Sequence, residues 1–134
     1  MLLSARMMSH VAHVNEFDVV ESYTFTQGDS TYVYFQLVDS SVDSDLTPPY
    51  RRYIPVLGAT VSVKFQSVDS AKTIERAAEM AFPNDDRSIW RVIILPTDSI
   101  VGTRDMKLVL TEDGTKTYGY VRQAVSIKSQ DMSF

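Results

Sequence analysis

Two histidines, His10 and His13, have the spacing of a candidate metal site. Residues three apart share one face of a helix, and imidazole nitrogens bind zinc well. A zinc site needs further ligands, and only the carboxylates of Glu16 and Asp18 follow nearby. We therefore interpret both histidines as part of a solvated N-terminal segment and predict no bound metal.

Three aspartates, Asp85, Asp86 and Asp98, are candidates for a calcium site, which takes about six to eight oxygen ligands. Their spacing matches no calcium-binding loop, and Asn84-Asp85-Asp86 has the composition of an ordinary turn. Glycoside hydrolysis would need two carboxylates facing each other across a cleft. Because the acids of this chain fall mainly in turns, we predict neither a calcium site nor a hydrolase.

The sequence also lacks the motifs of covalent and phosphoryl-transfer catalysis. It contains no cysteine, which excludes a thiolate nucleophile, a thiolate metal site and a disulfide framework. It has no Gly-x-Ser-x-Gly turn, and a Ser-His-Asp set would have to recruit an N-terminal histidine. The five glycines are isolated and form no phosphate-binding loop. We predict a protein that is not an enzyme and binds no cofactor.

Charge and hydropathy argue against two classes of partner. The chain has 134 residues, of which 17 are acidic and 13 basic, and its net charge is −4. The bases are interspersed with acids and form no stripe for a phosphate backbone, so we expect no nucleic acid. The N-terminal apolar run is short and contains Arg6, and no segment approaches the roughly 20 apolar residues of a membrane span. We expect no signal peptide and no membrane association.

The elements that would position any site are predicted to be strands, because apolar and polar residues alternate along most of the chain. The clearest segments are 31–38, 60–66, 88–95 and 106–111. The segment 88–95 is apolar on nearly both faces, which is typical of a central strand. The predicted inward side chains of these segments are Val33, Phe35, Leu37, Val61, Val63, Phe65, Trp90, Val92, Ile94, Met106, Leu108 and Leu110.

A hairpin is predicted near the C-terminus, because Asp113-Gly114 supplies the positive φ angles of a tight turn. The segment 117–128 then pairs back as the last strand, and 17–25 is predicted as the first. Several short strands separated by turns indicate a sandwich or barrel. The side chains expected to be buried in the last and first strands are Val121, Val125, Ile127, Phe17, Val19 and either Tyr23 or Phe25.

The segment 71–82 has two interpretations. It is rich in helix formers, and Ile74, Ala77, Ala78 and Ala81 make a helical stripe. The same segment alternates as a strand would, with its even-numbered residues from 74 to 82 on one side. We favour a strand, because the turn composition of 83–87 leads directly into 88–95.

The segment Asp39–Pro55 is predicted to be a long loop, because its prolines remove the amide donors that a central strand needs. Long loops of this kind are often functional. The segment contains Tyr50-Arg51-Arg52-Tyr53, and tyrosine and arginine are enriched at protein interfaces. A plainly solvated loop remains an equal alternative.

The chain is expected to be one domain at 17–128, with an N-terminal arm at 1–16 and a C-terminal tail at 129–134. Arms outside a core can reach neighbouring subunits. The residues predicted to contact a partner are Tyr50, Arg51, Arg52 and Tyr53 of the loop, Met7 and Met8 of the arm, and Phe134 of the tail.

Four tyrosines, Tyr32, Tyr34, Tyr118 and Tyr120, are placed by the alternation on the outer faces of strands. Exposed tyrosines stack on sugars, so a carbohydrate-binding module for host attachment is an alternative function. Such a module would need them on one accessible face. Cross-strand packing within the sheet explains each of them without any partner, and we favour that explanation.

The order of turn signals from residue 25 onward resembles a family of bacteriophage domains. A strand ends near Gly28-Asp29, an apolar strand closes at Asp39, and a Gly-Ala-x-Val-x-Val strand begins at Gly58. A short turn at Pro96–Gly102 and a hairpin with Asp113-Gly114 at its tip follow. This order is similar to that of the immunoglobulin-like N-terminal domain of baseplate upper proteins and of related tail, neck and fibre-attachment domains.

The resemblance covers roughly residues 20–128 and implies an all-β, immunoglobulin-like antiparallel sandwich of about seven strands. It also implies a structural virion protein, assembled in the host cytoplasm, that binds other virion proteins in a multi-copy assembly. The family carries no catalytic residues, so none is transferred. The chain departs from the pattern in the segment 39–55 and in carrying no fibre or coiled coil, which leaves its place in the particle open.

Overall fold

The structure, a computed structural model, describes residues 2–11, 16–26, 30–39, 51–67, 73–81, 88–94 and 102–129. Every regular element in these ranges is a strand, which confirms the all-β prediction, and none of them contains a helix able to cross a membrane. The strands are β1 (Leu3–Val11), β2 (Glu16–Val20), β3 (Tyr23–Thr26), β4 (Thr31–Asp39), β5 (Arg51–Arg52), β6 (Thr60–Ser67), β7 (Thr73–Ala77), β8 (Glu79–Met80), β9 (Ile89–Ile94), β10 (Gly102–Glu112) and β11 (Thr115–Lys128).

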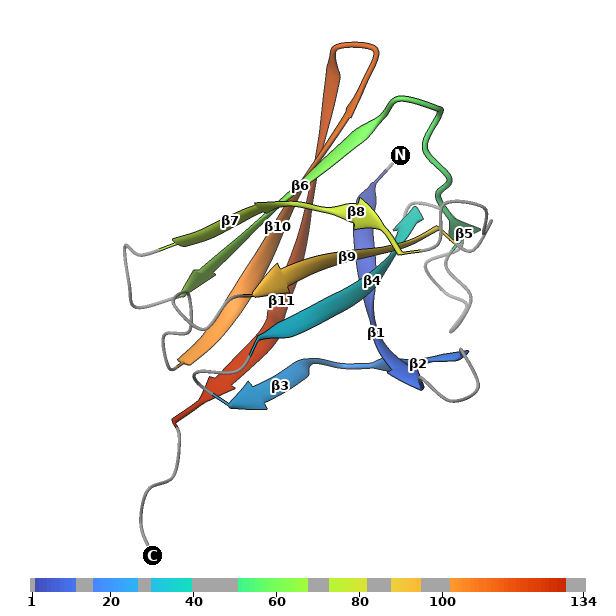
Figure 1. Cartoon of the computed structure of the whole chain (residues 1–134). Coiled ribbons are helices and arrows are strands. Elements are labelled where there is room, and N and C mark those ends of the chain that lie inside the picture. The colour runs from blue at the N-terminus through green and yellow to red at the C-terminus, as the bar shows by residue number, and fades with distance from the viewer. Residues whose placement is uncertain are drawn as a thin grey trace, which may run out of the picture.

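The strands form one sheet that curls into a nearly closed barrel (Figure 1). Its main path runs β7-β6-β10-β11-β1-β4-β9-β8. The two ends of this path, β7 and β8, are separated in the sequence only by Ala78, whose N–H donates to the carbonyl of Val61 at 2.8 Å. The chain therefore passes from one end of the sheet to the other within a few residues, which brings the two ends together.

The core is the inner face of this barrel. The predicted inward side chains of β4, β6, β9 and β10 are all buried, and Trp90 is 5% exposed. These residues form one cluster with Ile74, Val125 and Ile127. The alternation therefore gave the correct inner face of each of these strands. The central strand β4 is buried on both faces from Val33 to Val38. Its inner face belongs to the main core, and on its outer face Tyr34 packs with Met8, Ile89 and Phe17.

The predicted arm at 1–16 is wrong, because β1 is a central strand of the sheet. It pairs antiparallel with β4 over Leu3–Met8 and meets β11 in parallel at Leu3 and Gly119. Gly119 permits this contact: a Cβ atom there would lie 2.7 Å from the carbonyl oxygen of Leu3. Leu3, Ala5 and Met7 point into the core. The prediction of a purely antiparallel arrangement is therefore also wrong, because β1 and β11 meet in parallel.

The predicted first strand at 17–25 is divided into two. β2 pairs with the second half of β1, and β3 pairs in parallel with the end of β11, so together they fill the space where β1 and β11 diverge (Figure 1). Phe25 is buried as expected. Val19 is exposed, contrary to the prediction, because it lies on the outer side of β2.

The preference for strand over helix at 71–82 is confirmed for the described residues, where β7 and β8 flank Ala78. Ile74 is buried against Phe65 of β6, while Glu75 and Ala77 are exposed. As strands, this segment pairs with two others: β7 with β6, and β8 with β9. Tertiary pairing therefore outweighed local helix propensity.

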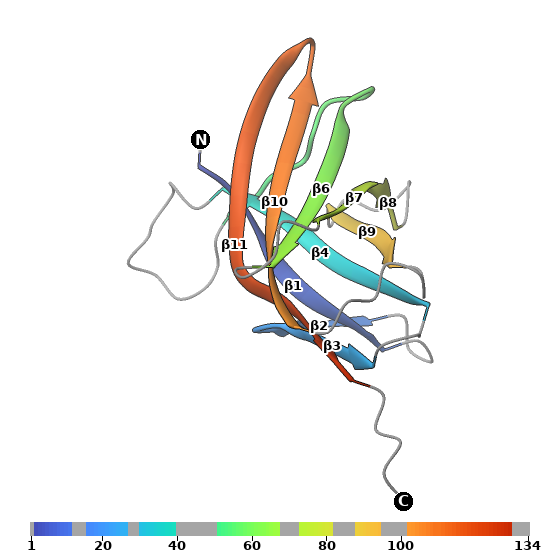
Figure 2. The ribbon, with the colours of Figure 1, turned by 90° about the vertical axis from the view of Figure 1, so that its left-hand side faces the viewer.

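The predicted hairpin is confirmed, with φ angles of 48° at Asp113 and 79° at Gly114. β10 and β11 pair from this turn to Gly102 and Ile127, with a register shift between Arg104 and Met106. Opposite the shift, Gln123 has a φ of 52°, and its N–H donates to Asp105 Oδ1 at 2.8 Å. The upper part of the hairpin extends past the other strands (Figure 2).

Candidate interaction surface

The end of the molecule that carries the β10–β11 turn also holds the segment 53–59, which leads into β6 (Figure 1). Tyr53 fixes this segment to both sides of the barrel. Its N–H donates to the Leu37 carbonyl at 2.9 Å, and its carbonyl accepts from Ser88 Oγ at 2.5 Å. Its hydroxyl donates to Glu112 Oε1 of β10 at 2.5 Å, and the other carboxylate oxygen of Glu112 accepts from the N–H of Val56 at 3.2 Å.

The hydrogen bond to Glu112 raises the pKa of Tyr53 to about 12, since ionisation would place a second negative charge beside the carboxylate. The phenol therefore stays protonated and remains a donor over the physiological range. One carboxylate thus holds both Tyr53 and Val56, so the backbone that presents the following side chains has a defined position.

Three apolar side chains project from this tethered segment. Ile54 and Val56 are about half exposed, and Leu57 is fully exposed. Exposed apolar side chains grouped together are typical of surfaces that bind another protein, whereas single ones are ordinary. We call Ile54, Val56 and Leu57 the apolar end patch.

The residues predicted to form an interface lie in different environments in the structure. Tyr53 lies beside the apolar end patch, but it is half-buried and works as a tether. Arg51 and Arg52 form β5, paired with Asp39 and Val38 of β4, and the structure describes only their backbone. Tyr50 and Phe134 lie outside the described residues, so their role stays a prediction.

Met7 and Met8 are not available to a partner, which corrects their assignment to an arm. They are 2% and 6% exposed. Met7 belongs to the main core, and Met8 packs with Tyr34 and Ile89 in a second cluster on the outer side of the sheet. The apolar end patch was not predicted from the sequence. Its signal there is a short apolar run within a proline-containing segment.

The four tyrosines lie on two separate parts of the outer surface. Tyr34 is 9% exposed and packs against Phe17 with ring centroids 5.3 Å apart, as cross-strand packing predicts. Tyr32 is more exposed, and the guanidinium of Arg91 lies 4.4 Å from its ring centroid. Both belong to β4, whereas Tyr118 and Tyr120 belong to β11, with β1 between the two strands. A single row of four tyrosines for a sugar is therefore not formed.

Tyr118 and Tyr120 lie on the outer face of β11, and Tyr118 is 69% exposed. The hydroxyl of Tyr120 donates to Asp105 Oδ2 at 2.6 Å. The N–H of Gln123 and this hydroxyl both donate to Asp105, so they lower the pKa of its carboxyl group. The two tyrosines line a shallow pocket of about 650 Å³ with Leu2, Lys64, Lys107 and Val109.

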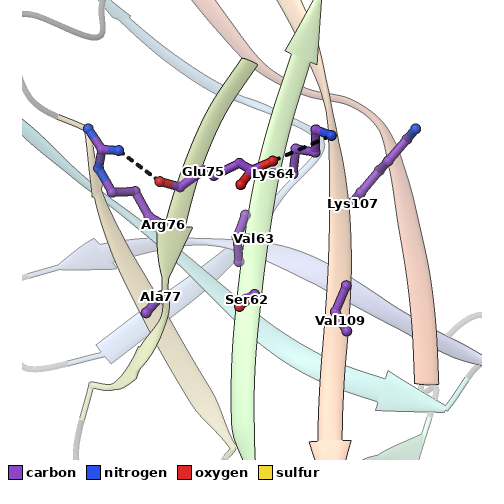
Figure 3. A pocket seen from close by; sticks show the side chains of 8 residues that line it. All are labelled: Ser62, Val63, Lys64, Glu75, Arg76, Ala77, Lys107 and Val109. Atoms are coloured by element: carbon purple, nitrogen blue, oxygen red, sulfur yellow. Dashed lines mark hydrogen bonds and ion pairs between the residues drawn. The ribbon is translucent and has the colours of Figure 1, made fainter. Parts of the chain in front are cut away.

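A second shallow pocket, of about 440 Å³, lies on the outer face of β7, β6 and β10 (Figure 3). Its carboxylate, Glu75, forms an ion pair with Lys64 at 3.4 Å, and the Glu75 carbonyl accepts from Arg76 at 2.7 Å. Lys107 points along the same surface from β10 (Figure 3). The pocket therefore presents neighbouring opposite charges and does not hold two facing carboxylates.

The candidate metal ligands are only partly described. His10 belongs to β1, where its backbone lies opposite Phe17, so the helical face expected for His10 and His13 is wrong at His10. His13, Asp85, Asp86 and Asp98 lie outside the described residues. Within the residues that the structure does describe, no group of three or more histidine, aspartate or glutamate side chains is placed to hold a metal ion.

Arg104 is a buried charged residue that the sequence reading did not single out. Its side chain lies on the inner face of β10, and burial lowers the pKa of its guanidinium. The alternation of Met106, Leu108 and Leu110, extended by one step, would have placed it inside.

No family model matches the sequence, and no curated protein matches it.

Proposed function

We propose that this chain is a structural component of a bacteriophage particle that acts through protein–protein contacts. Within this proposal the domain is immunoglobulin-like, and it occupies a tail, baseplate, neck or fibre-attachment position in a multi-copy virion assembly. The observation that carries the proposal is the strand order, which agrees with the fold that the sequence resemblance implies.

In an immunoglobulin-like domain, strands A, B, E and D form one sheet and C, F and G the other. Taking β1, β4, β9 and β8 as A, B, E and D reproduces the first sheet in its order of neighbours. Taking β6, β10 and β11 as C, F and G reproduces the second, with β7 beside β6 as C′. The additions are then β2 and β3 between A and B, and β5 between B and C. The contact between β1 and β11 joins the two sheets on one side.

This assignment gives the apolar end patch a structural context. The patch then belongs to the B–C connection, and the Asp113-Gly114 turn is the F–G connection at the same end. Connections at one end of such sandwiches are commonly used for recognition. We propose that Ile54, Val56 and Leu57 contact a neighbouring virion protein, and that Tyr53 and Glu112 hold them in place.

The virion assignment is tested by mass spectrometry of purified particles from the phage that encodes the chain. We expect the chain in intact particles, at a fixed ratio to the major structural proteins. Particles that contain none of it would show that the chain is not a virion component, whatever its fold.

The position of the interface is tested with two matched valine variants. Val56→Asp changes the apolar end patch, and Val19→Asp changes an equally exposed valine on β2, toward the other end of the molecule. We expect Val56→Asp to lower incorporation into particles by about tenfold or more, because a buried aspartate in an interface is strongly unfavourable. Equal incorporation of the two variants would remove the apolar end patch from the proposal.

A carbohydrate-binding module remains the second candidate, supported only by the pocket at Tyr118 and Tyr120. Adjacent exposed tyrosines beside lysines suit an acidic sugar, which would stack on a ring and pair with an ammonium group. A glycan array distinguishes the two functions. Binding that is lost in Tyr118→Ala and kept in Tyr32→Ala would favour the module, whereas no binding to any glycan would remove it.

A further inference from the structure

The first half of β11 has an edge that no described strand covers. β11 pairs with β10 along its whole upper part, but on its other side it meets β1 only at Gly119 and β3 only from Val125 onward. Thr115–Tyr118 therefore has β10 on one side and no other described strand on the second. In an antiparallel ladder the backbone groups of alternate residues point away from the partner, so this edge presents N–H and C=O groups that no described strand pairs.

The pocket of Tyr118 and Tyr120 lies directly beside this edge. Leu2 and Val109 give it an apolar lining, and the exposed Tyr118 belongs both to the pocket lining and to the edge segment. Lys107 lines the pocket, and Lys116 is exposed on the same face of β11. An incoming strand would gain backbone hydrogen bonds from the edge and a place for apolar side chains in the pocket, and negative charge would be favoured nearby.

The segment after β11 has the sequence that fits this description. Residues 129–134 read Ser-Gln-Asp-Met-Ser-Phe, with Met132 and Phe134 two apart and therefore on one face of an extended strand. Asp131 is its one charged residue, and it is acidic. We propose that this segment of one copy adds as a strand to the Thr115–Tyr118 edge of a second copy, with Met132 and Phe134 in the pocket beside Tyr118.

The distance from the end of β11 to the Thr115–Tyr118 edge is too long for residues 129–134 to reach the edge of their own copy. Lys128, the last residue of β11, lies ten residue steps after Tyr118, which is roughly 33 Å along a strand at about 3.3 Å per residue. Six extended residues span at most about 22 Å. The bend at Gln123 shortens the path, but the end of β11 and the Asp113-Gly114 turn remain at opposite ends of the molecule (Figures 1 and 2). The segment therefore reaches the edge of a neighbour.

Such a contact is head-to-tail, because the segment leaves one end of a copy and binds near the other end of the next. Head-to-tail contacts close into rings or continue as filaments. This inference deepens the proposed function by naming a second copy of the chain as one partner, and it rests on the chain being an assembling subunit. It uses a different surface from the apolar end patch.

The first test is the concentration dependence of the mass of the purified chain, measured by sedimentation velocity. We expect the full chain to associate beyond a dimer as the concentration rises, and a chain that stops at Ser129 to remain monomeric with an unchanged circular dichroism spectrum. A full chain that stays monomeric at every concentration, or a shortened chain that still associates, would overturn the proposal.

The second test uses the two-residue period of an added strand. Met132→Asp and Phe134→Asp change the face placed in the pocket, and Ser133→Asp adds the same charge on the opposite face. We expect the first two variants to weaken association by about tenfold or more each, and Ser133→Asp to have a much smaller effect. Equal effects of all three would indicate simple charge repulsion and would contradict strand addition.

The edge itself is tested with matched tyrosines. Tyr118→Ser removes the side chain beside the edge. Tyr32→Ser removes an exposed tyrosine from β4, which β1 separates from β11. Only Tyr118→Ser should weaken the binding of a labelled peptide of residues 129–134 to the shortened chain, by about tenfold in fluorescence anisotropy. No binding of this peptide to the shortened chain, or equal loss in both variants, would remove the edge as the binding site.

These outcomes are separable from those of the proposed function. A chain present in particles but monomeric when purified would keep the virion assignment and remove the head-to-tail contact. A chain that associates through residues 129–134 but is absent from particles would keep the head-to-tail contact and remove the virion assignment.

Discussion

At the scale of single residues, Gly119 decides whether β1 can join the sheet. Its missing side chain leaves room for the backbone of Leu3, which lies where a Cβ atom would otherwise be. Its backbone φ is not in the left-handed region, so the requirement is for space and not for conformational freedom.

We expect Gly119→Ala to destabilise the protein by about 1–3 kcal/mol, the usual cost of forcing extra volume into a packed site. The new Cβ would lie 2.7 Å from the Leu3 carbonyl oxygen, so β1 or β11 would have to move. Urea unfolding measures the change, with the exposed Lys116→Ala on the same strand as a control within about 0.5 kcal/mol. Equal stability of the two variants would mean that β1 does not lie against Gly119.

Tyr53 gives a prediction about alkaline stability. Its pKa is raised from 10.0 to about 12 in the folded chain by the hydrogen bond to Glu112. A raised pKa means that its contribution to stability is complete below pH 10 and is lost as the pH rises from 10 to 12. In urea unfolding across this range, we expect the wild-type chain to lose more stability than Tyr53→Phe, which cannot ionise. Parallel pH profiles would contradict the Tyr53–Glu112 contact.

At the scale of elements, β1 is the strand that joins the two halves of the sheet. It pairs with β4 on one side and with β11 and β2 on the other, and it supplies Leu3, Ala5 and Met7 to the core. An arm outside the core could be removed without harm, whereas a central strand cannot.

Deleting residues 2–11 should therefore unfold the domain, because it exposes the edge of β4 and a set of buried apolar side chains. The measurement is the circular dichroism spectrum together with proton NMR dispersion. The chain that stops at Ser129 is the control and should keep a folded spectrum. A well-dispersed spectrum after loss of β1 would mean that the strand is peripheral.

At the scale of the whole molecule, the barrel encloses a main core, to which β9 contributes the side chain of Trp90. The chain brings the two ends of the sheet path together through Ala78, so the strands of one sheet enclose most of the inner face. A side chain in this core has few ways to relax when it is shortened.

Trp90→Ala should lower the free energy of unfolding by about 3–5 kcal/mol, as expected when a large buried aromatic side chain is removed. Tyr118→Ala is the matched aromatic control, because Tyr118 is exposed. We expect the control to change stability by less than about 0.5 kcal/mol in thermal or urea unfolding. A small effect at Trp90 would place its side chain on the outer face of β9.

The sequence by itself determined the class of the fold, the inner face of most strands and the hairpin at Asp113-Gly114. Side chains alternate across a strand with a period of two, so the pattern from Thr31 to Val38 reports which residues turn inward whatever the neighbouring strand is. An Asp-Gly pair likewise sets its turn through its own φ angles. These are local properties, and local properties can be read from one segment.

Only the tertiary structure decided which strands are neighbours, and with them the candidate surface. The alternation of a strand carries no information about which strand it pairs with. It therefore did not predict that residues 3–11 lie between β4 and β11, or that Tyr34 packs against Phe17 while Tyr118 stays exposed. The uncovered edge at Thr115–Tyr118 and the tether from Tyr53 to Glu112 depend on the same long-range pairings. They follow from how segments far apart in the sequence share one closed core, which no single segment encodes.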